Sequence, residues 1–226
     1  MKKVTLLFGL FIPLLMVAQE PDELVQKIKA KYEKVNDYQA SGKMKTNVSF
    51  MKVPEAKVKI YYKKPDKLKI KNENGISFVP KGSVNINMGN IFGVKSYTAI
   101  DAGTGTVQGK TVKIIKILPE DDQSGIVLST LFIDEKQQLV LKTKTTTRDN
   151  GTYELLLQYG KYAEWGLPDK AEFTFSTKDY KLPKGVTIDY DNGSGGNAQP
   201  KTKTGKVEIT YNSYIINKGV NDSEFK

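Results

Sequence analysis

The sequence of 226 residues contains no histidine and no cysteine. These absences exclude a histidine general base, a thiolate nucleophile, a zinc site built from cysteine and histidine, and any disulfide. Carboxylate pairs remain as catalytic candidates, and the densest acidic cluster is Glu120-Asp121-Asp122. This cluster lies between Pro119 and Ser124-Gly125, a pattern typical of a solvated turn. The composition therefore leaves little room for enzymatic chemistry and predicts no metal site.

Negative charge is also in short supply, since 25 acidic residues face 35 basic ones and the formal net charge is +10. A basic protein can bind nucleic acid, an anionic membrane surface or an acidic partner. Residues 103–111 (GTGTVQGKT) imitate a phosphate-binding loop, but the required helix is missing and residues 112–118 favour a strand. We therefore expect no nucleotide site and no nucleic-acid partner.

Long hydrophobic runs are absent except at the amino terminus. Lys2 and Lys3 precede the uncharged segment Val4–Ala18, which is too short for a membrane span of about 20 residues. A buried N-terminal helix is the alternative, but polar residues begin immediately at Gln19. We expect a secretory signal over residues 1–18, cleaved near Ala18. An exported, soluble single domain over residues 19–226 would remain, without a cysteine to lipidate.

The mature part begins with helical periodicity and continues with a period of two. Pro21-Asp22-Glu23 is typical of a helix start, and an apolar stripe at helical spacing follows. The stripe consists of Leu24, Val25, Ile28, Tyr32 and Val35. From Tyr38 onward apolar residues alternate with polar ones, which predicts strands. Examples of residues that should share an apolar face are Val58, Ile60 and Tyr62; Leu139 and Leu141; Tyr153, Leu155, Leu157 and Tyr159; and Val207, Ile209 and Tyr211.

Strands with one lysine-bearing face and one apolar face predict an antiparallel sheet that is covered on one side. One helix is too small to cover eight or more strands, so the sheet must curl, pair with a second sheet, or receive another cover. Segment Ser83–Val94 is a candidate cover, because it is neither clearly alternating nor clearly helical and displays Met88, Ile91, Phe92 and Val94.

Several segments together resemble the LolA-like superfamily of outer-membrane lipoprotein carriers and lipoprotein-sorting proteins. The most specific is Lys64-Pro65-Asp66-Lys67-Leu68, which is similar to a basic-Pro-x-x-aromatic segment of that family. Three further segments agree with the family in their order along the chain: residues 35–38 (VNDY), in which the expected helix ends, residues 131–134 (LFID) and residues 211–217 (YNSYIIN). The resemblance implies a mostly β, α+β fold: a strongly curved antiparallel sheet that forms an incomplete, half-open barrel. An N-terminal amphipathic helix and a lid segment would cover an apolar cavity.

The resemblance also implies a function without catalysis or cofactor. The protein would be a periplasmic carrier that binds acylated lipoproteins or lipid and delivers them toward the outer membrane. Its partners would be an inner-membrane release complex and an outer-membrane acceptor, and it would act as a monomer. By position, Lys64 would fasten the lid, Leu68 would line the cavity, and Pro65 would break the strand where the sheet bends. The full set of expected cavity and lid residues is Val58, Ile60, Tyr62, Lys64, Pro65, Leu68, Ile70, Met88, Ile91 and Phe92.

Two departures from the family pattern affect the named residues. Lysine stands in place of the usual arginine and lacks its planar, bidentate fork, and leucine stands in place of an aromatic. Leu68 is equally consistent with a packed core. Two other functions also fit the sequence: a periplasmic lipoprotein or lipid sensor that regulates an envelope-stress pathway, and a structural β-protein with a filled core.

Overall fold

The computed structural model describes residues 20–48, 51–52, 54–65, 67–73, 96–120, 125–149, 151–176 and 204–225. The expected helix is present as α1 (Pro21–Tyr32), with proline at its start and acidic residues in the first turn. Lys29 and Lys31 lie in the last turn, so both ends complement the helix dipole. The buried side chains of α1 are Leu24, Val25 and Ile28, three members of the predicted stripe. Tyr32 is only partly buried, and Val35, which the stripe placed in the helix, is buried but lies after the end of α1. Within the described residues no helix is long and apolar enough to cross a membrane.

The alternating segments form strands. In chain order these are β1 (Asp37–Val48), β2 (Met51–Lys52), β3 (Ala56–Lys63), β4 (Lys67–Asn72), β5 (Tyr97–Val107), β6 (Lys110–Pro119), β7 (Ile126–Asp134), β8 (Leu139–Thr147), β9 (Gly151–Gln158), β10 (Lys170–Ser176) and β11 (Thr204–Ile216). Two short 3-10 helices, η2 (Ala163–Trp165) and η3 (Asp222–Phe225), complete the described elements.

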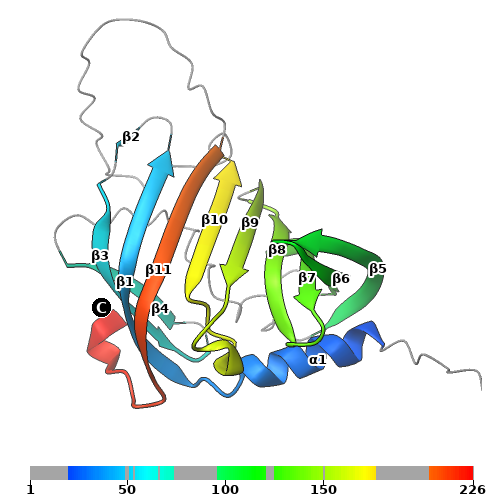
Figure 1. The fold of residues 1–226 in the computed structure, drawn as a ribbon, viewed down its shortest axis with the longest axis horizontal. Helices are drawn as coiled ribbons and strands as arrows, with labels where there is room; N and C mark the ends of the chain where they lie inside the picture. The colour runs from blue at the N-terminus through cyan, green and yellow to red at the C-terminus, as the bar shows by residue number, and fades with distance from the viewer. Residues whose placement is uncertain are drawn as a thin grey trace, which may run out of the picture.

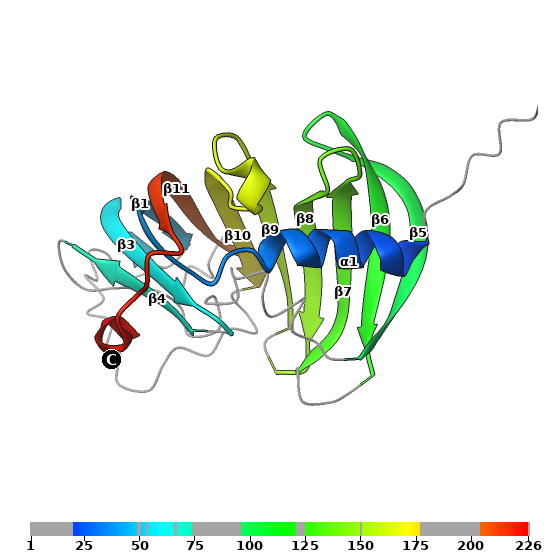
Figure 2. The same cartoon turned by 90° about the horizontal axis from the view of Figure 1, so that it is seen from below.

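All the strands belong to one antiparallel sheet, and its order is β4-β3-β1-β11-β10-β9-β8-β7-β6-β5, with β2 paired to β1. Among the described strands β4 and β5 end the sheet without pairing to each other, so the barrel is not closed. The sheet is strongly curved (Figure 1), and α1 runs across β5 to β9 on one side (Figure 2). The expected half-open barrel with one N-terminal helix is confirmed.

The core lies on the face of the sheet that packs against α1, called here the inner face. Residues paired across neighbouring strands form continuous rows on this face. One row runs through Ile115, Leu131, Thr143, Leu155, Phe173 and Val207. These side chains are at most 3% exposed, and the apolar ones form one cluster with the buried residues of α1. Because this cluster reaches from β6 to β4, the helix and the whole sheet share a single core.

A second, smaller cluster contains Leu139 and Leu141, which share an apolar face as the alternation predicted. Leu139 and Leu141 do not join the main core but pack with Val107 and Val112 of the β5–β6 hairpin. The cause is a register shift between β7 and β8, where Ile133 pairs with Val140 immediately after Phe132 pairs with Lys142. The shift adds one residue to β8, so simple alternation fails at this point.

Candidate functional site

The predicted cavity residues of β3 and β4 lie on the inner face. Val58, Ile60, Tyr62 and Ile70 are 1%, 1%, 7% and 8% exposed. Ile60 pairs with Ile70, and Tyr62 pairs with Leu68, so the residues form two short rows at the edge of the sheet. Leu68 differs from the other four because it is only partly buried while it packs against the core. Its side chain is therefore the member of this set that both solvent and core can reach.

Lys64 and Pro65 form the turn between β3 and β4. The sequence suggested that one strand bends at Pro65, but the structure differs. The strand β3 ends at Lys63, and a second strand, antiparallel to it, begins at Lys67. A residue without a backbone N–H fits this turn, where the sheet ladder is already interrupted.

The side chain of Lys64 connects this turn to the end of α1. Its ammonium group donates to the backbone oxygen of Glu33 and to Oδ1 of Asn36, the latter at 3.3 Å. The backbone N–H of Lys64 also donates to the backbone oxygen of Asn36 at 2.9 Å. Glu33 is the C-cap residue of the helix, where free carbonyl groups and the helix dipole both favour a cation. Lys64 thus contacts the end of α1, the helix that covers part of the inner face.

Tyrosine hydroxyls hold α1 over the other half of the sheet. The hydroxyl of Tyr32 lies 2.7 Å from that of Tyr159, which donates to the backbone oxygen of Val140 at 2.9 Å. Near the start of the helix, Gln26 Nε2 donates to the hydroxyl of Tyr97 at 2.8 Å. Burial raises the pKa of Tyr32 above its usual value, and burial also raises the pKa of Tyr97 to about 12. These phenols stay protonated at neutral pH and act as hydrogen-bonding groups.

A cluster of tyrosines lies where α1 joins β1, and sequence reasoning missed it. Its members are Tyr38, Tyr62, Tyr162, Tyr211 and Tyr214. Tyr38 lies 5.2 Å from Tyr62 and 5.3 Å from Tyr214, measured between ring centres. Tyr214 in turn lies 4.9 Å from Tyr162 and 5.0 Å from Tyr211. Because Tyr62 pairs with Leu68, the cluster places wide apolar rings, each with a polar tip, beside Leu68.

Buried hydroxyl groups interrupt the apolar inner face. Thr143 and Thr145 of β8 and Ser129 of β7 have no exposed surface, and Thr46 of β1 is 6% exposed. Ser129 and Thr145 pair at 2.9 Å between their oxygens. Within the described part of the chain, the hydroxyls of Thr46 and Thr143 have no hydrogen-bond partner. The alternation of lysine and threonine over residues 142–146 was the sequence signal for this group.

Other predicted features lie outside the described residues. They are the signal segment 1–18, the candidate cover Ser83–Val94, and its members Met88, Ile91 and Phe92. Across the described ranges, no group of three or more acidic, histidine or cysteine residues is placed to hold a metal ion.

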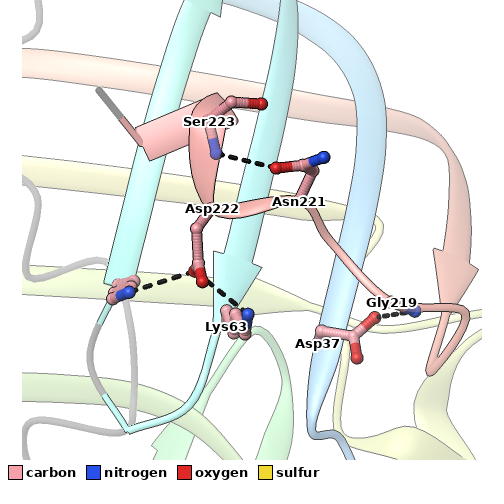
Figure 3. A network of polar contacts seen from close by, with 7 residues as sticks. Asp37, Lys63, Gly219, Asn221, Asp222 and Ser223 are labelled. Carbon is pink, nitrogen blue, oxygen red and sulfur yellow. Dashed lines mark hydrogen bonds and ion pairs between the residues drawn. The ribbon is translucent and has the colours of Figure 1, made fainter.

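On the opposite, outer face, the carboxy-terminal segment packs against β3 and β4 (Figure 3). Asp222 of η3 accepts from Lys63 at 3.0 Å and from Lys67 at 3.1 Å, and Glu224 accepts from Lys71 at 2.6 Å. Hydrogen bonds from Lys63 and Lys67 lower the pKa of Asp222, and a hydrogen bond from Lys71 lowers that of Glu224. The lysines beside Pro65 therefore bind the carboxy-terminal segment on one face, while Lys64 binds α1.

The sequence matches no protein-family model and no curated protein. Solved structures do share the fold. A domain described as an outer membrane lipoprotein-sorting protein domain, from Vibrio parahaemolyticus, is 11% identical with a TM-score of 0.56, covering 90% of this chain and 94% of its own. A DUF1329 family protein from Desulfovibrio piger is 12% identical with a TM-score of 0.54, covering 92% of this chain and 98% of its own.

A LolA superfamily protein from Nitrosomonas europaea is 9% identical with a TM-score of 0.51, covering 89% of this chain and 96% of its own. The matched regions span nearly the whole of each chain, so the likeness concerns the entire sheet and not one hairpin. The chain therefore has a LolA-like fold: one curved, open antiparallel sheet with an amphipathic helix across its inner face.

Proposed function

We propose that this protein is a non-enzymatic periplasmic carrier that binds acyl chains of lipoproteins or lipids and delivers them toward the outer membrane. The LolA-like fold supports the proposal, as does the description of the Vibrio parahaemolyticus relative as a lipoprotein-sorting domain. An inner-membrane release complex and an outer-membrane acceptor would then be its partners, and a cleaved signal over residues 1–18 would direct it to the periplasm.

The observation that carries the proposal is the inner face itself. It is a continuous apolar face on a sheet whose described end strands do not pair with each other, and α1 runs across β5 to β9 but not across β3 and β4 (Figure 2). The side chains of this face are buried, so an acyl chain would reach them when the cover moves away. An acyl chain placed on such a surface leaves water, which stabilises the complex by about 0.8 kcal/mol per CH₂. A chain of about 14 methylenes would thus gain roughly 11 kcal/mol before the entropy lost on association, about 4–15 kcal/mol, is subtracted. A ligand with more than one acyl chain would therefore bind more stably than a ligand with a single chain.

The proposed entry point is the edge formed by β3 and β4. Leu68 is partly exposed there, the inner-face residues Ile60, Tyr62 and Ile70 lie next to it, and Lys64 connects the same hairpin to the end of α1. Movement of the helix end away from the hairpin would widen access to these residues. Lys64 is in this proposal a positioning residue for the cover.

The buried hydroxyls offer a place for the polar part of such a ligand. Thr143 lies fully buried in the middle of the apolar row, and its hydroxyl has no partner in the described ranges. A buried hydroxyl without a hydrogen bond costs about 1–3 kcal/mol, and an ester or amide oxygen of a lipid would remove that cost. The inner face would then bind methylene groups and orient one carbonyl group.

Native mass spectrometry of the protein purified from the periplasm, without detergent, tests the proposal. We expect adducts with the masses of acylated lipid or lipoprotein, and their loss after extraction with organic solvent. The extracted protein should then regain lipid from donor vesicles and transfer it to acceptor vesicles. A protein that never carries lipid and takes up none would refute the carrier function and favour a structural role. Binding without transfer would instead favour the sensor alternative.

A further inference from the structure

The outer face of β1, β3 and β4 carries an unusual concentration of positive charge. Side chains that point away from the core on these strands include eight lysines, called here the lysine face: Lys43, Lys45, Lys57, Lys59, Lys63, Lys67, Lys69 and Lys71. Their neighbours in sequence, such as Met44, Val58 and Ile70, are the buried ones. On these three described strands the only acidic residue is Asp37, at the first position of β1.

Acids from neighbouring segments neutralise only part of this charge. Glu55 binds Lys43 at 3.4 Å, and Glu73 binds Lys59 at 3.2 Å. Asp222 and Glu224 of the carboxy-terminal segment bind Lys63, Lys67 and Lys71, as described above. Among the described residues, the carboxylates in these ion pairs are Glu55, Glu73, Asp222 and Glu224, and they come from loops or from η3.

Lys45 and Lys57 are the least compensated members of the lysine face. Both are exposed, and neither forms an ion pair with any residue that the structure describes. The backbone partner of Lys57 is another lysine, Lys43. Lys45 pairs in register with Glu208, but the carboxylate of Glu208 binds Lys170 at 2.9 Å.

The same outer face has a different character farther along the sheet. On β8 to β11 the charges alternate in sign and form ion pairs across neighbouring strands. Lys142 binds Glu154 at 2.8 Å, and Lys206 binds Glu172 at 2.7 Å. Such cross-strand pairs stabilise a sheet locally and leave little net charge. Among the described residue pairs of β1, β3 and β4, by contrast, a lysine lies opposite an acidic residue only where Lys63 pairs with Asp37.

We propose that the lysine face is a docking surface for an anionic phospholipid bilayer. The positive groups are spread over three adjacent strands, about 4.8 Å apart, and so form a broad surface and not a single pocket. They are all lysines, which act as mobile point charges and do not impose the bidentate geometry with which arginine recognises an individual carboxylate or phosphate. A layer of phosphate head groups can contact lysines across the whole surface, whereas the acidic carboxy-terminal segment binds only Lys63, Lys67 and Lys71 among those described. This inference does not rest on the proposed function, because it concerns the opposite face of the sheet.

Vesicle co-sedimentation tests the docking surface. The full chain would be mixed at low ionic strength with vesicles of phosphatidylcholine alone or with 30–40% phosphatidylglycerol. We expect binding only to the anionic vesicles, and its loss as salt shortens the screening length to about 8 Å at 0.15 M. Each lysine near an anionic surface strengthens binding roughly fivefold, so Lys45→Glu/Lys57→Glu should weaken it on the order of 25-fold or more.

The matched control is Lys116→Glu/Lys136→Glu, which changes the net charge equally through exposed lysines of β6 and the β7–β8 turn. The control should keep most of the binding, and both variants should keep the thermal midpoint of the parent, which shows that they fold. Equal loss in both variants would mean that overall charge and not this face governs binding, and would overturn the proposal. Failure to bind anionic vesicles would also overturn it, as would tighter binding to polyglutamate or to a DNA duplex than to the vesicles.

Discussion

Replacement of Leu68 by glutamate distinguishes a ligand-binding surface from a packed core. The comparison variant is Leu157→Glu, in which the replaced side chain is 2% exposed and lies in the main core. At Leu157 the change removes about 1.5–3 kcal/mol of apolar burial and adds about 2–7 kcal/mol for an unpaired polar group. Against a typical stability of 5–15 kcal/mol, this variant should be largely unfolded or strongly destabilised.

Leu68 is only partly buried and lies on the edge strand β4, so a carboxylate there can remain hydrated. We expect a loss of about 1 kcal/mol, which for a chain of this size lowers the thermal midpoint by about 2–4 °C. Retention of a fluorescent fatty acyl probe should fall much more, because the acyl chain would meet a charge. Circular dichroism during heating and probe fluorescence measure the two effects on the same samples.

Leu68→Ala is the control for lost apolar surface, and it should reduce probe binding less than the glutamate variant does. The reasoning fails if Leu68→Glu unfolds the protein as severely as Leu157→Glu, since Leu68 would then be ordinary core. It also fails if the glutamate variant binds the probe as tightly as the parent does.

Three further predictions concern other parts of the molecule. Thr143→Val removes a buried hydroxyl without a described partner, so the free energy of unfolding should rise by about 1–3 kcal/mol in denaturant titration, whereas retention of ester-linked lipid should weaken. Lys64→Ala removes the cation that contacts the backbone oxygen of Glu33 at the end of α1. Amide hydrogen exchange in the last turn of α1 should then become faster, by a factor that corresponds to about 0.3–1 kcal/mol, while exchange in β9 stays unchanged. Asp222 and Glu224 have lowered pKa values in the folded protein. Their contribution to stability is therefore present above the carboxyl pKa of the unfolded chain and is lost as the pH falls through the pKa of the folded protein. NMR signals of η3 should shift on acidification below about pH 4, and Asp222→Asn/Glu224→Gln should reproduce the shift at pH 7.

Much of the architecture was predictable because local patterns determine it. The proline and acids at the start of α1 and its apolar stripe predicted a helix, and the helix indeed buries Leu24, Val25 and Ile28. Alternation in β3 correctly separated the inner residues Val58 and Ile60 from the outer lysines. The pattern placed Leu139 and Leu141 on one apolar face but did not show that this face lies outside the main core. The reason is a bulge, which has no signature in the periodicity, and the added residue changes the face of its neighbours.

The candidate site was less predictable because it depends on strand order. Tyr38, Tyr62 and Tyr214 lie far apart in the sequence and meet only because β1 pairs with both β3 and β11. The contact of Asp222 with Lys63 likewise requires the chain after β11 to return over the outer face of β3. Periodicity gives the face of a residue but not the neighbouring strand, so these contacts could not be inferred from the sequence.

The place of β11 between β1 and β10 has a consequence for folding. Tyr38 pairs with Ile216, so the central ladder joins residues from nearly opposite ends of the described chain. Such long-range pairing makes folding slow, because the conformational entropy of closing the loop between the two strands is lost before these contacts form. Until β11 docks, the strands β4-β3-β1 and β10 to β5 are two separate sheets. The facing edges of β1 and β10 are then unpaired, and they are the sites at which newly made copies could aggregate by strand pairing.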